Sequence, residues 1–283
     1  MPKLTLGGGA RLHYQQIGTG PDLVLIHGLT GNLAVWHLKI IPMLSSRFRT
    51  LTYDLRGHGY SDVTPNGYSC DQMASDLLEL LDALALDRPA LVGHSFGADI
   101  SLYFALNHPE RVSEVIAIEP ALPAMIHLRS REEWEGWDYW VEILENSGHP
   151  VPPERRTDVD YLFRASLEVP KKWGPLNGLP RNPKPFLRLI DETAVATEYE
   201  EIGSLTLERI PAISTPVILM YAAQSAFLGT HDYLLEHLPH ARSIILPRTE
   251  LGHFGPLEQP EAVAEHIAES LSDLELAAEA VGD

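Results

Sequence analysis

The stretch Gly93-His94-Ser95-Phe96-Gly97 joins two segments of opposite character. The short apolar run PALV before it is typical of a buried strand, and the segment FGADISLYFAL that continues from it is typical of a helix. A G-x-S-x-G motif between a strand and a helix is typical of a sharp turn that presents a serine nucleophile. Side chains at the two glycine positions would collide with neighbouring backbone, and the helix N-terminus favours negative charge beside the serine. Ser95 is therefore our candidate nucleophile.

Strand-like and helix-like segments alternate on both sides of this motif. We predict strands at Lys3–Leu6, Arg11–Ile17, Asp22–Ile26, Arg49–Tyr53, Ala90–Val92, Val112–Ile118, Pro216–Met220 and Ser243–Leu246, and helices at Cys70–Leu86, Phe96–Asn107, His231–Leu238 and Pro260–Leu271. Such an alternation favours an α/β fold, with a mostly parallel eight-stranded sheet that carries helices on both faces.

The alternation breaks between about residues 120 and 213. That segment is rich in proline and contains four of the five tryptophans, Trp134, Trp137, Trp140 and Trp173. It predicts a helical, loop-rich insertion that lies over the sheet. The first three tryptophans recur every third residue and share one helix face, which either packs onto the core or lines an apolar pocket.

These patterns predict the domain organisation. We expect a core made of residues 1–120 and 214–271, with a cap at residues 121–213. Residues 272–283 form an acidic, alanine-rich tail that we expect to be a frayed helix end or disordered.

A serine hydroxyl is a poor nucleophile without an adjacent base. His253 lies between the last predicted strand and the last predicted helix, where a catalytic histidine is expected to follow the serine and the acid along the chain. Two backbone N–H groups are expected to bind the oxyanion. One belongs to Phe96, directly after the nucleophile, and the other to Leu29 in the loop His27-Gly28-Leu29-Thr30-Gly31.

Taken together, these motifs resemble the α/β-hydrolase superfamily over about residues 10–270. The matching stretches are His27-Gly28-Leu29, DLRGHGYS at residues 54–61, the motif at 93–97, and Gly252-His253-Phe254. The resemblance implies the α/β-hydrolase fold, with residues 54–61 as a structural turn. It also implies an acid in the loop after Pro216–Met220, in a pattern like G-x-x-D. That loop reads YAAQSAF, so Ser225 stands where the aspartate would be.

Three carboxylates remain as candidates for the acid: Glu119, Asp232 and Glu250. Glu119 is favoured because it leaves the sheet at the same edge as Ser95, and Pro120 stops its strand. Some relatives, including certain lactonases and dehalogenases, carry the acid at this earlier position. Asp232 has an ordinary structural role near a helix N-terminus, and Glu250 would have to fold back sharply toward His253.

Three shorter stretches resemble zearalenone-type lactonases: IEPALP at residues 118–123, YAAQS at 221–225, and PKKW at 170–173. This resemblance implies a cofactor-free Ser-His-Glu hydrolase that cleaves an ester or lactone of an apolar, ring-containing substrate such as a zearalenone-like macrolactone. Trp173 would then offer its indole N–H to a substrate oxygen, or would simply pack in the cap. The alternatives are a carbon–carbon bond hydrolase of a diketone, which uses the same triad, and a small-molecule receptor on the same fold.

Composition limits the partners and the compartment. The 283-residue chain has 21 basic and 39 acidic residues and a net charge of −18, which argues against nucleic acids and anionic membranes as partners. A single cysteine, Cys70, and the absence of a signal-peptide or membrane-spanning pattern favour a cytoplasmic protein. The sequence contains no H-E-x-x-H spacing, so we predict no metal site. An exposed apolar cap edge is a candidate homodimer interface.

Overall fold

The computed structural model describes residues 2–29, 31–128, 135–168, 184–249 and 252–281. Within these residues one eight-stranded sheet has the order β1-β2-β4-β3-β5-β6-β7-β8. Its strands are β1 (Lys3–Thr5), β2 (Arg11–Ile17), β3 (Asp22–Ile26), β4 (Arg49–Tyr53), β5 (Ala90–His94), β6 (Val115–Ile118), β7 (Val217–Ala222) and β8 (Ala241–Leu246). Strand β2 runs antiparallel to both of its neighbours, β1 and β4, and every other pair of neighbouring strands is parallel. The predicted fold class is therefore confirmed.

The register of the central strands aligns their carboxyl ends. His94 pairs with Ile118, and Ile118 pairs with Met220 on the next strand. These strands are apolar and buried along their length because helices cover both faces of the sheet. The loops after β5, β6 and β7 therefore begin side by side at one edge of the sheet.

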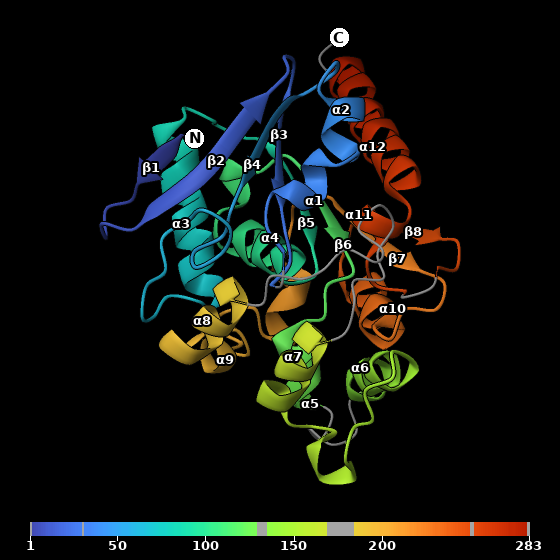
Figure 1. The fold of residues 1–283 in the computed structure, drawn as a ribbon. Coiled ribbons are helices and arrows are strands. Elements are labelled where there is room, and N and C mark those ends of the chain that lie inside the picture. Colours follow the sequence, from blue (N-terminus) through green and yellow to red (C-terminus); the bar gives the residue numbers. More distant parts are fainter. Residues whose placement is uncertain (1, 30, 129–134, 169–183, 250–251, 282–283) are drawn as a thin grey trace.

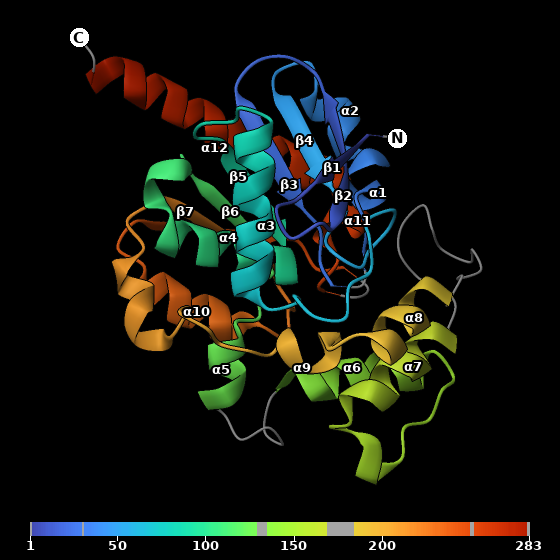
Figure 2. The same ribbon diagram turned by 90° about the vertical axis from the view of Figure 1, so that its left-hand side faces the viewer.

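Two layers of helices sandwich the sheet (Figures 1 and 2). The core helices are α1 (Ala34–His37), α2 (Ile40–Leu44), α3 (Cys70–Ala83), α4 (Phe96–Asn107), α10 (Leu228–His237), α11 (Gly255–Glu258) and α12 (Pro260–Val281). Side chains of α3, α4 and α10 share one buried apolar cluster with the sheet, and side chains of α1, α2 and α12 share the other.

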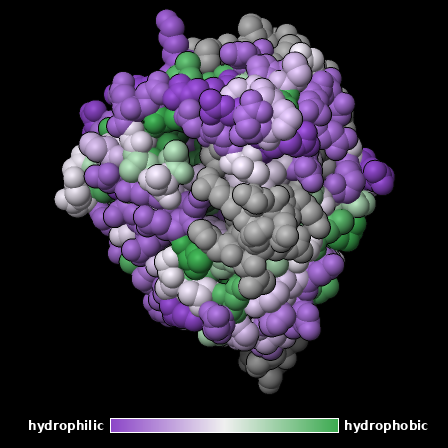
Figure 3. Space-filling view, turned by 90° about the horizontal axis from the view of Figure 1, so that it is seen from below, coloured by the Kyte–Doolittle hydropathy of each residue, from purple (hydrophilic) through white to green (hydrophobic). Residues whose placement is uncertain are grey.

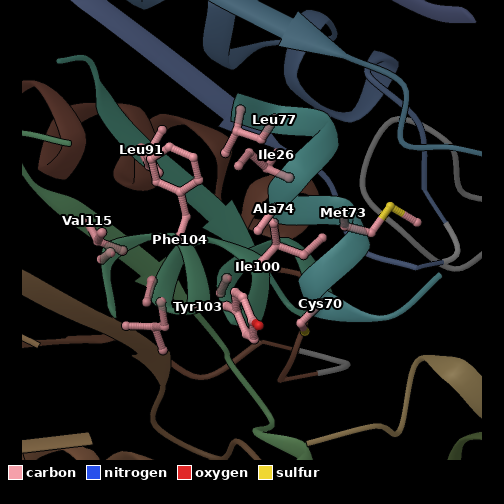
Figure 4. Close-up of a cluster of buried hydrophobic side chains, with 14 of the residues drawn as sticks. Ile26, Cys70, Met73, Ala74, Leu77, Leu91, Ile100, Tyr103, Phe104 and Val115 are labelled. Carbon is pink, nitrogen blue, oxygen red and sulfur yellow. The ribbon is translucent and has the colours of Figure 1, made fainter. Parts of the chain in front are cut away.

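Helix α4, which begins directly after Ser95, is the most deeply buried helix of the core. Eleven of its twelve residues are buried, because α4 lies between the sheet and α3. Figure 4 shows Phe104 and Ile100 of α4 among Leu91 of the sheet and Leu77 of α3. An all-round apolar helix is expected in such a position, and its packing fixes the residue before its first turn.

Five α-helices lie between β6 and β7 in the part of the insertion that is described: α5 (Pro123–Leu128), α6 (Glu135–Asn146), α7 (Val159–Glu168), α8 (Lys184–Glu192) and α9 (Val195–Glu198). Figure 1 shows them below the sheet. Trp137 is only 3% exposed and packs in a separate apolar cluster with Val141 and Leu162. The indole N–H of Trp140 donates to Ser166 Oγ at 2.8 Å, so both tryptophans contribute to packing within the insertion.

Several boundaries differ from the sequence prediction. Helix α10 begins at Leu228, three residues before its predicted start, and β6 begins at Val115, three residues after its predicted start. Helix α12 continues beyond its predicted end at Leu271 to Val281, so residues 272–281 follow the helical alternative expected for the tail. Alanine, leucine and glutamate are strong helix formers, and they make up seven of the ten residues of this stretch.

The surface seen from the cap side is mostly hydrophilic, with apolar side chains in small groups (Figure 3). Among the described residues, we find no helix of the length and apolar character that spanning a bilayer requires. The homodimer interface stays a prediction.

Candidate active site

Ser95 occupies the sharp turn between β5 and α4. Its φ is 53° and its ψ is −123°, a strained conformation that places the residue outside both the strand and the helix. A Cβ on Gly93 would lie 2.2 Å from the Gly97 carbonyl oxygen, and one on Gly97 would lie 2.3 Å from that of Ile26. Only glycine fits at these two positions, which explains why the motif folds in this way.

His253 lies in the loop between β8 and α11 and is 8% exposed. Its Nε2 is 3.1 Å from Ser95 Oγ, within hydrogen-bonding distance. His94, the residue before the nucleophile, donates from Nε2 to the main-chain oxygen of His253 at 2.8 Å. Aromatic rings surround the imidazole, with the ring centroid of Phe227 at 4.9 Å and that of Tyr139 in α6 at 6.4 Å. The histidine is therefore held next to the serine in an apolar environment.

Glu119 follows the last residue of β6 and is 1% exposed. Its Oε2 lies 3.5 Å from His253 Nδ1, longer than an ordinary N–H···O hydrogen bond, as is frequent in unliganded catalytic sites. Its Oε1 accepts a hydrogen bond of 2.6 Å from the Ala222 N–H, and its Oε2 accepts one from the Ser225 hydroxyl. Glu119 thus lies beside Nδ1 of the imidazole, and Ser95 lies beside Nε2 of the same ring.

Burial governs the protonation of these groups. It raises the pKa of Glu119 to about 8, against the opposing effect of the hydrogen bonds from Ser225 and Ala222. It lowers the pKa of His253 to about 4 and that of His94 to about 3. The neutral form of His253 is the one that can accept a proton from Ser95, and an imidazolium formed there would favour the ionised form of Glu119.

Leu29 and Phe96, the two residues expected to bind the oxyanion, flank Ser95. Phe96 is the first residue of α4. The loop after β3 approaches from the other side, since a Cβ on Gly28 would lie 3.0 Å from Ser95 Cβ. His58 holds this loop: its ring nitrogens face the carbonyl oxygens of Arg56 and Leu29. The arrangement is compatible with the expected oxyanion hole, whose assignment stays a proposal.

The other sequence candidates have different positions. Asp232 is 79% exposed, and its carboxylate accepts from His231 Nδ1 at 2.8 Å rather than approaching His253. Glu250 and Trp173 lie outside the described residues. The structure thus brings Ser95, His253 and Glu119 together and leaves Asp232 apart.

Sequence reasoning missed three supporting residues. In the sequence, Ser225 is marked only as the position where an aspartate is expected, but its hydroxyl contacts Glu119. His94 is marked only as part of the G-x-S-x-G motif, but it contacts the His253 loop. Asp99 in α4 is 3% exposed and accepts the Leu122 N–H at 3.1 Å, just beyond Glu119. The only signal for Asp99 in the sequence was an aspartate within an otherwise mostly apolar helix, one turn after the nucleophile.

A small apolar pocket lies beside this site. It is lined by Leu29 together with Phe186, Leu189, Ile190, Val195, Ala196 and Tyr199 of α8, α9 and their surroundings. No polar surface contributes to its lining. Among the described residues, no group of three or more His, Cys, Asp or Glu side chains is arranged to hold a metal ion.

Comparison with known proteins relates part of this chain to a known fold family. The family model described as alpha/beta hydrolase fold matches residues 21–147. Epoxide hydrolase 3 of Siraitia grosvenorii is 29% identical over 165 residues, which are 56% of this chain and 52% of that protein. The 2-(acetamidomethylene)succinate hydrolase of Mesorhizobium japonicum is 40% identical over 112 residues, 40% of each chain. The alignments therefore span about half the length of these curated relatives or less.

A solved structure supports the same assignment over nearly the full chain. Est816, an N-acyl homoserine lactone degrading enzyme, superposes with a TM-score of 0.69 and covers 95% of this chain and 99% of its own, at 23% identity. Identity at this level establishes the fold alone. With the glycine-flanked serine at the end of β5, the histidine after β8 and the family model matched over residues 21–147, this chain has the α/β-hydrolase fold.

Proposed function

We propose that this protein is a serine hydrolase that cleaves an ester or lactone of an apolar substrate through Ser95, His253 and Glu119. The observation that carries this proposal is the continuous line of contacts from Ser95 Oγ to His253 Nε2 at 3.1 Å, and from His253 Nδ1 to Glu119 Oε2 at 3.5 Å. Asp232 has no part in it.

Each group has a role in the proposed reaction. Neutral His253 accepts the proton of Ser95 at Nε2 as Oγ bonds to the carbonyl carbon, while its Nδ1–H points at Glu119. Glu119 stabilises the resulting imidazolium. The N–H groups of Leu29 and Phe96 bind the oxyanion of the tetrahedral intermediate. His253 then protonates the leaving oxygen, and water releases the acyl group by the reverse sequence.

The apolar pocket supports an apolar substrate. Leu29 belongs both to the proposed oxyanion hole and to the lining of this pocket, so the apolar side chains around it lie next to the site. The pocket has room for about one water molecule, so helices α8 and α9 would have to shift to admit a substrate group. We extend the proposal to ring-containing substrates, with zearalenone-like macrolactones as the first class to test and Trp173 as a candidate donor to a substrate oxygen.

The test compares kcat/KM of the wild type with Ser95→Ala, Glu119→Gln and Asp232→Asn on aryl esters, macrocyclic lactones and a vinylogous diketone. Ser95→Ala is expected to lose about 10⁶-fold and Glu119→Gln about 10³–10⁴-fold. Asp232→Asn is the matched control and should keep wild-type activity. An active Glu119→Gln variant would refute the acid assignment.

The same panel separates the alternatives. Turnover of the diketone with little ester cleavage would replace the proposal by carbon–carbon bond hydrolysis. Tight binding with a single slow turnover would favour a receptor. Activity on esters that is unaffected by Ser95→Ala would contradict the proposal altogether.

A further inference from the structure

The acid of the proposed triad sits on an unusual piece of backbone. Glu119 has a φ of 55° and Leu122 a φ of 56°, both in the left-handed region that non-glycine residues seldom occupy. A residue in this region stays there only when its surroundings hold it in place. The neighbours of this turn therefore determine where the Glu119 carboxylate lies.

Three neighbours hold the backbone of this turn. Asp99 accepts the Leu122 N–H, the Tyr221 hydroxyl donates to the Pro120 carbonyl oxygen at 2.9 Å, and the Thr230 hydroxyl donates to that of Ala121 at 3.2 Å. None of these contacts reaches the carboxylate itself. They set where the turn lies but leave the side chain of Glu119 free to rotate.

Ser225 reaches the carboxylate directly. It is 6% exposed, and its hydroxyl contacts Glu119 Oε2, the same oxygen that faces His253 Nδ1. The Ser225 oxygen also accepts the Phe227 N–H at 3.0 Å. In the ionised form that the proposed mechanism requires, the Glu119 carboxylate can only accept, and an amide N–H can only donate. In that form the single hydroxyl proton of Ser225 must therefore point at Glu119.

We propose that Ser225 is the positioning residue of the triad acid: its hydroxyl, held by the Phe227 amide, fixes Oε2 of Glu119 opposite His253. The loop after β7, which in the resembled family carries the acid itself, here carries the donor that orients an acid on the neighbouring strand. The catalytic consequence of this inference rests on the proposed function, whereas the contact between Ser225 and Glu119 is independent of that function.

The hydrogen bond also favours the charged form of Glu119, against the effect of burial. The groups that surround this carboxylate are His253, the Ala222 amide, Ser225, Glu258 of α11, His231 of α10, and the phenols of Tyr139 in α6 and Tyr221 in β7. Glu258 raises the pKa of Glu119 and His231 lowers it. Of these, Ser225 and Ala222 donate hydrogen bonds to the carboxylate, and of the two only Ser225 can be changed without altering the backbone.

The first test is kinetic. Ser225→Ala is expected to lower kcat by about tenfold to a hundredfold with little change in KM, since the lost bond is one to a charged group. The acidic limb of kcat/KM should move to higher pH. Ser225→Thr keeps the hydroxyl and should restore kcat and the pH profile. Thr230→Val, which removes a hydroxyl contact from the same turn but not from the carboxylate, is the control and should leave the profile unmoved.

A second readout does not depend on turnover. The carboxyl stretching band that disappears in Glu119→Gln is followed by infrared spectroscopy as a function of pH. The titration of this band should move to higher pH in Ser225→Ala and stay in place in Thr230→Val. If Ser225→Ala does not fold, Ser225→Cys, which keeps the volume and weakens the donor, replaces it.

The outcomes separate the two proposals. An unmoved Glu119 band in Ser225→Ala overturns the role of Ser225, whatever the activity. Equal loss of kcat in the alanine and threonine variants also overturns it, because loop packing rather than the hydroxyl would then matter. A shifted band in a protein without Ser95-dependent turnover supports the positioning role and refutes the proposed function instead.

Discussion

His94 donates a hydrogen bond from Nε2 to the main-chain oxygen of His253 at 2.8 Å. The residue before the proposed nucleophile thereby holds the loop that carries the proposed base, 159 positions later in the chain. Burial lowers the pKa of His94 to about 3, so the ring is neutral and its Nε2 carries the proton. The distance between Ser95 and His253 is consequently set by the turn after β5 as well as by the loop after β8.

We expect His94→Phe to weaken catalysis because the ring volume stays while the donor is lost. A buried carbonyl without its partner costs about 1–3 kcal/mol in stability, and a shifted His253 should lower kcat by roughly tenfold or more. Urea unfolding and steady-state kinetics measure both effects. His237→Phe is the control, since His237 also contacts a carbonyl oxygen, that of Tyr233, but at the end of α10. Equal kcat values in the two variants would contradict this tether.

The pH profile should show two ionisations on its acidic side. Glu119 must be ionised and His253 neutral, and each form is lost as the pH falls through the corresponding pKa. With pKa values of about 8 for Glu119 and about 4 for His253, kcat/KM should decrease first on the weakly alkaline side and again at acidic pH. In Glu119→Gln the upper step should vanish while the lower one stays. An upper step that survives this substitution would belong to another group.

Asp99 should make the protein less stable as the pH rises. Burial raises its pKa in the folded state to about 8, above the value of about 3.9 expected in the unfolded chain. The folded state therefore binds more protons between about pH 4 and 8, and by linkage the free energy of unfolding falls as the pH increases through this window. Asp99→Asn can still accept the Leu122 N–H and should flatten this slope.

Thermal unfolding between pH 4 and 9 measures the contribution of Asp99. Asp87→Asn serves as the control because Asp87 is exposed at the end of the loop after α3. A wild-type slope that is unchanged in Asp99→Asn would show that Asp99 is not the group responsible.

Gly97→Ala should disrupt the turn around Ser95. The added Cβ would lie 2.3 Å from the Ile26 carbonyl oxygen and 2.7 Å from that of His27, both of which are backbone atoms that cannot move aside. We expect a loss of stability of about 1–3 kcal/mol and slower labelling of Ser95 by a fluorophosphonate. In the control Gly8→Ala, no atom lies within 4 Å of the new Cβ, so neither property should change. Equal labelling rates would contradict the steric argument.

The sequence alone determined most of the fold. Strands β3 and β4 and helix α4 were predicted with their observed bounds. The apolar run DLVLI marks β3, and the serine turn before α4 and His108-Pro109 after it mark the ends of that helix. Helix α12 was predicted too short, because the acidic composition of its last ten residues masked their helix propensity.

The sequence also named Ser95, Glu119 and His253 as candidates, because they follow β5, β6 and β8, which end at one edge of a parallel sheet. It left Glu119 and Asp232 as rivals, since both follow strands that end near the nucleophile. Only the tertiary structure separated them: Glu119 faces His253, while Asp232 faces His231 and the solvent. The contacts from Ser225 and His94 likewise join residues more than 100 positions apart, and such pairings are decided by the packing of the whole sheet rather than by any local pattern.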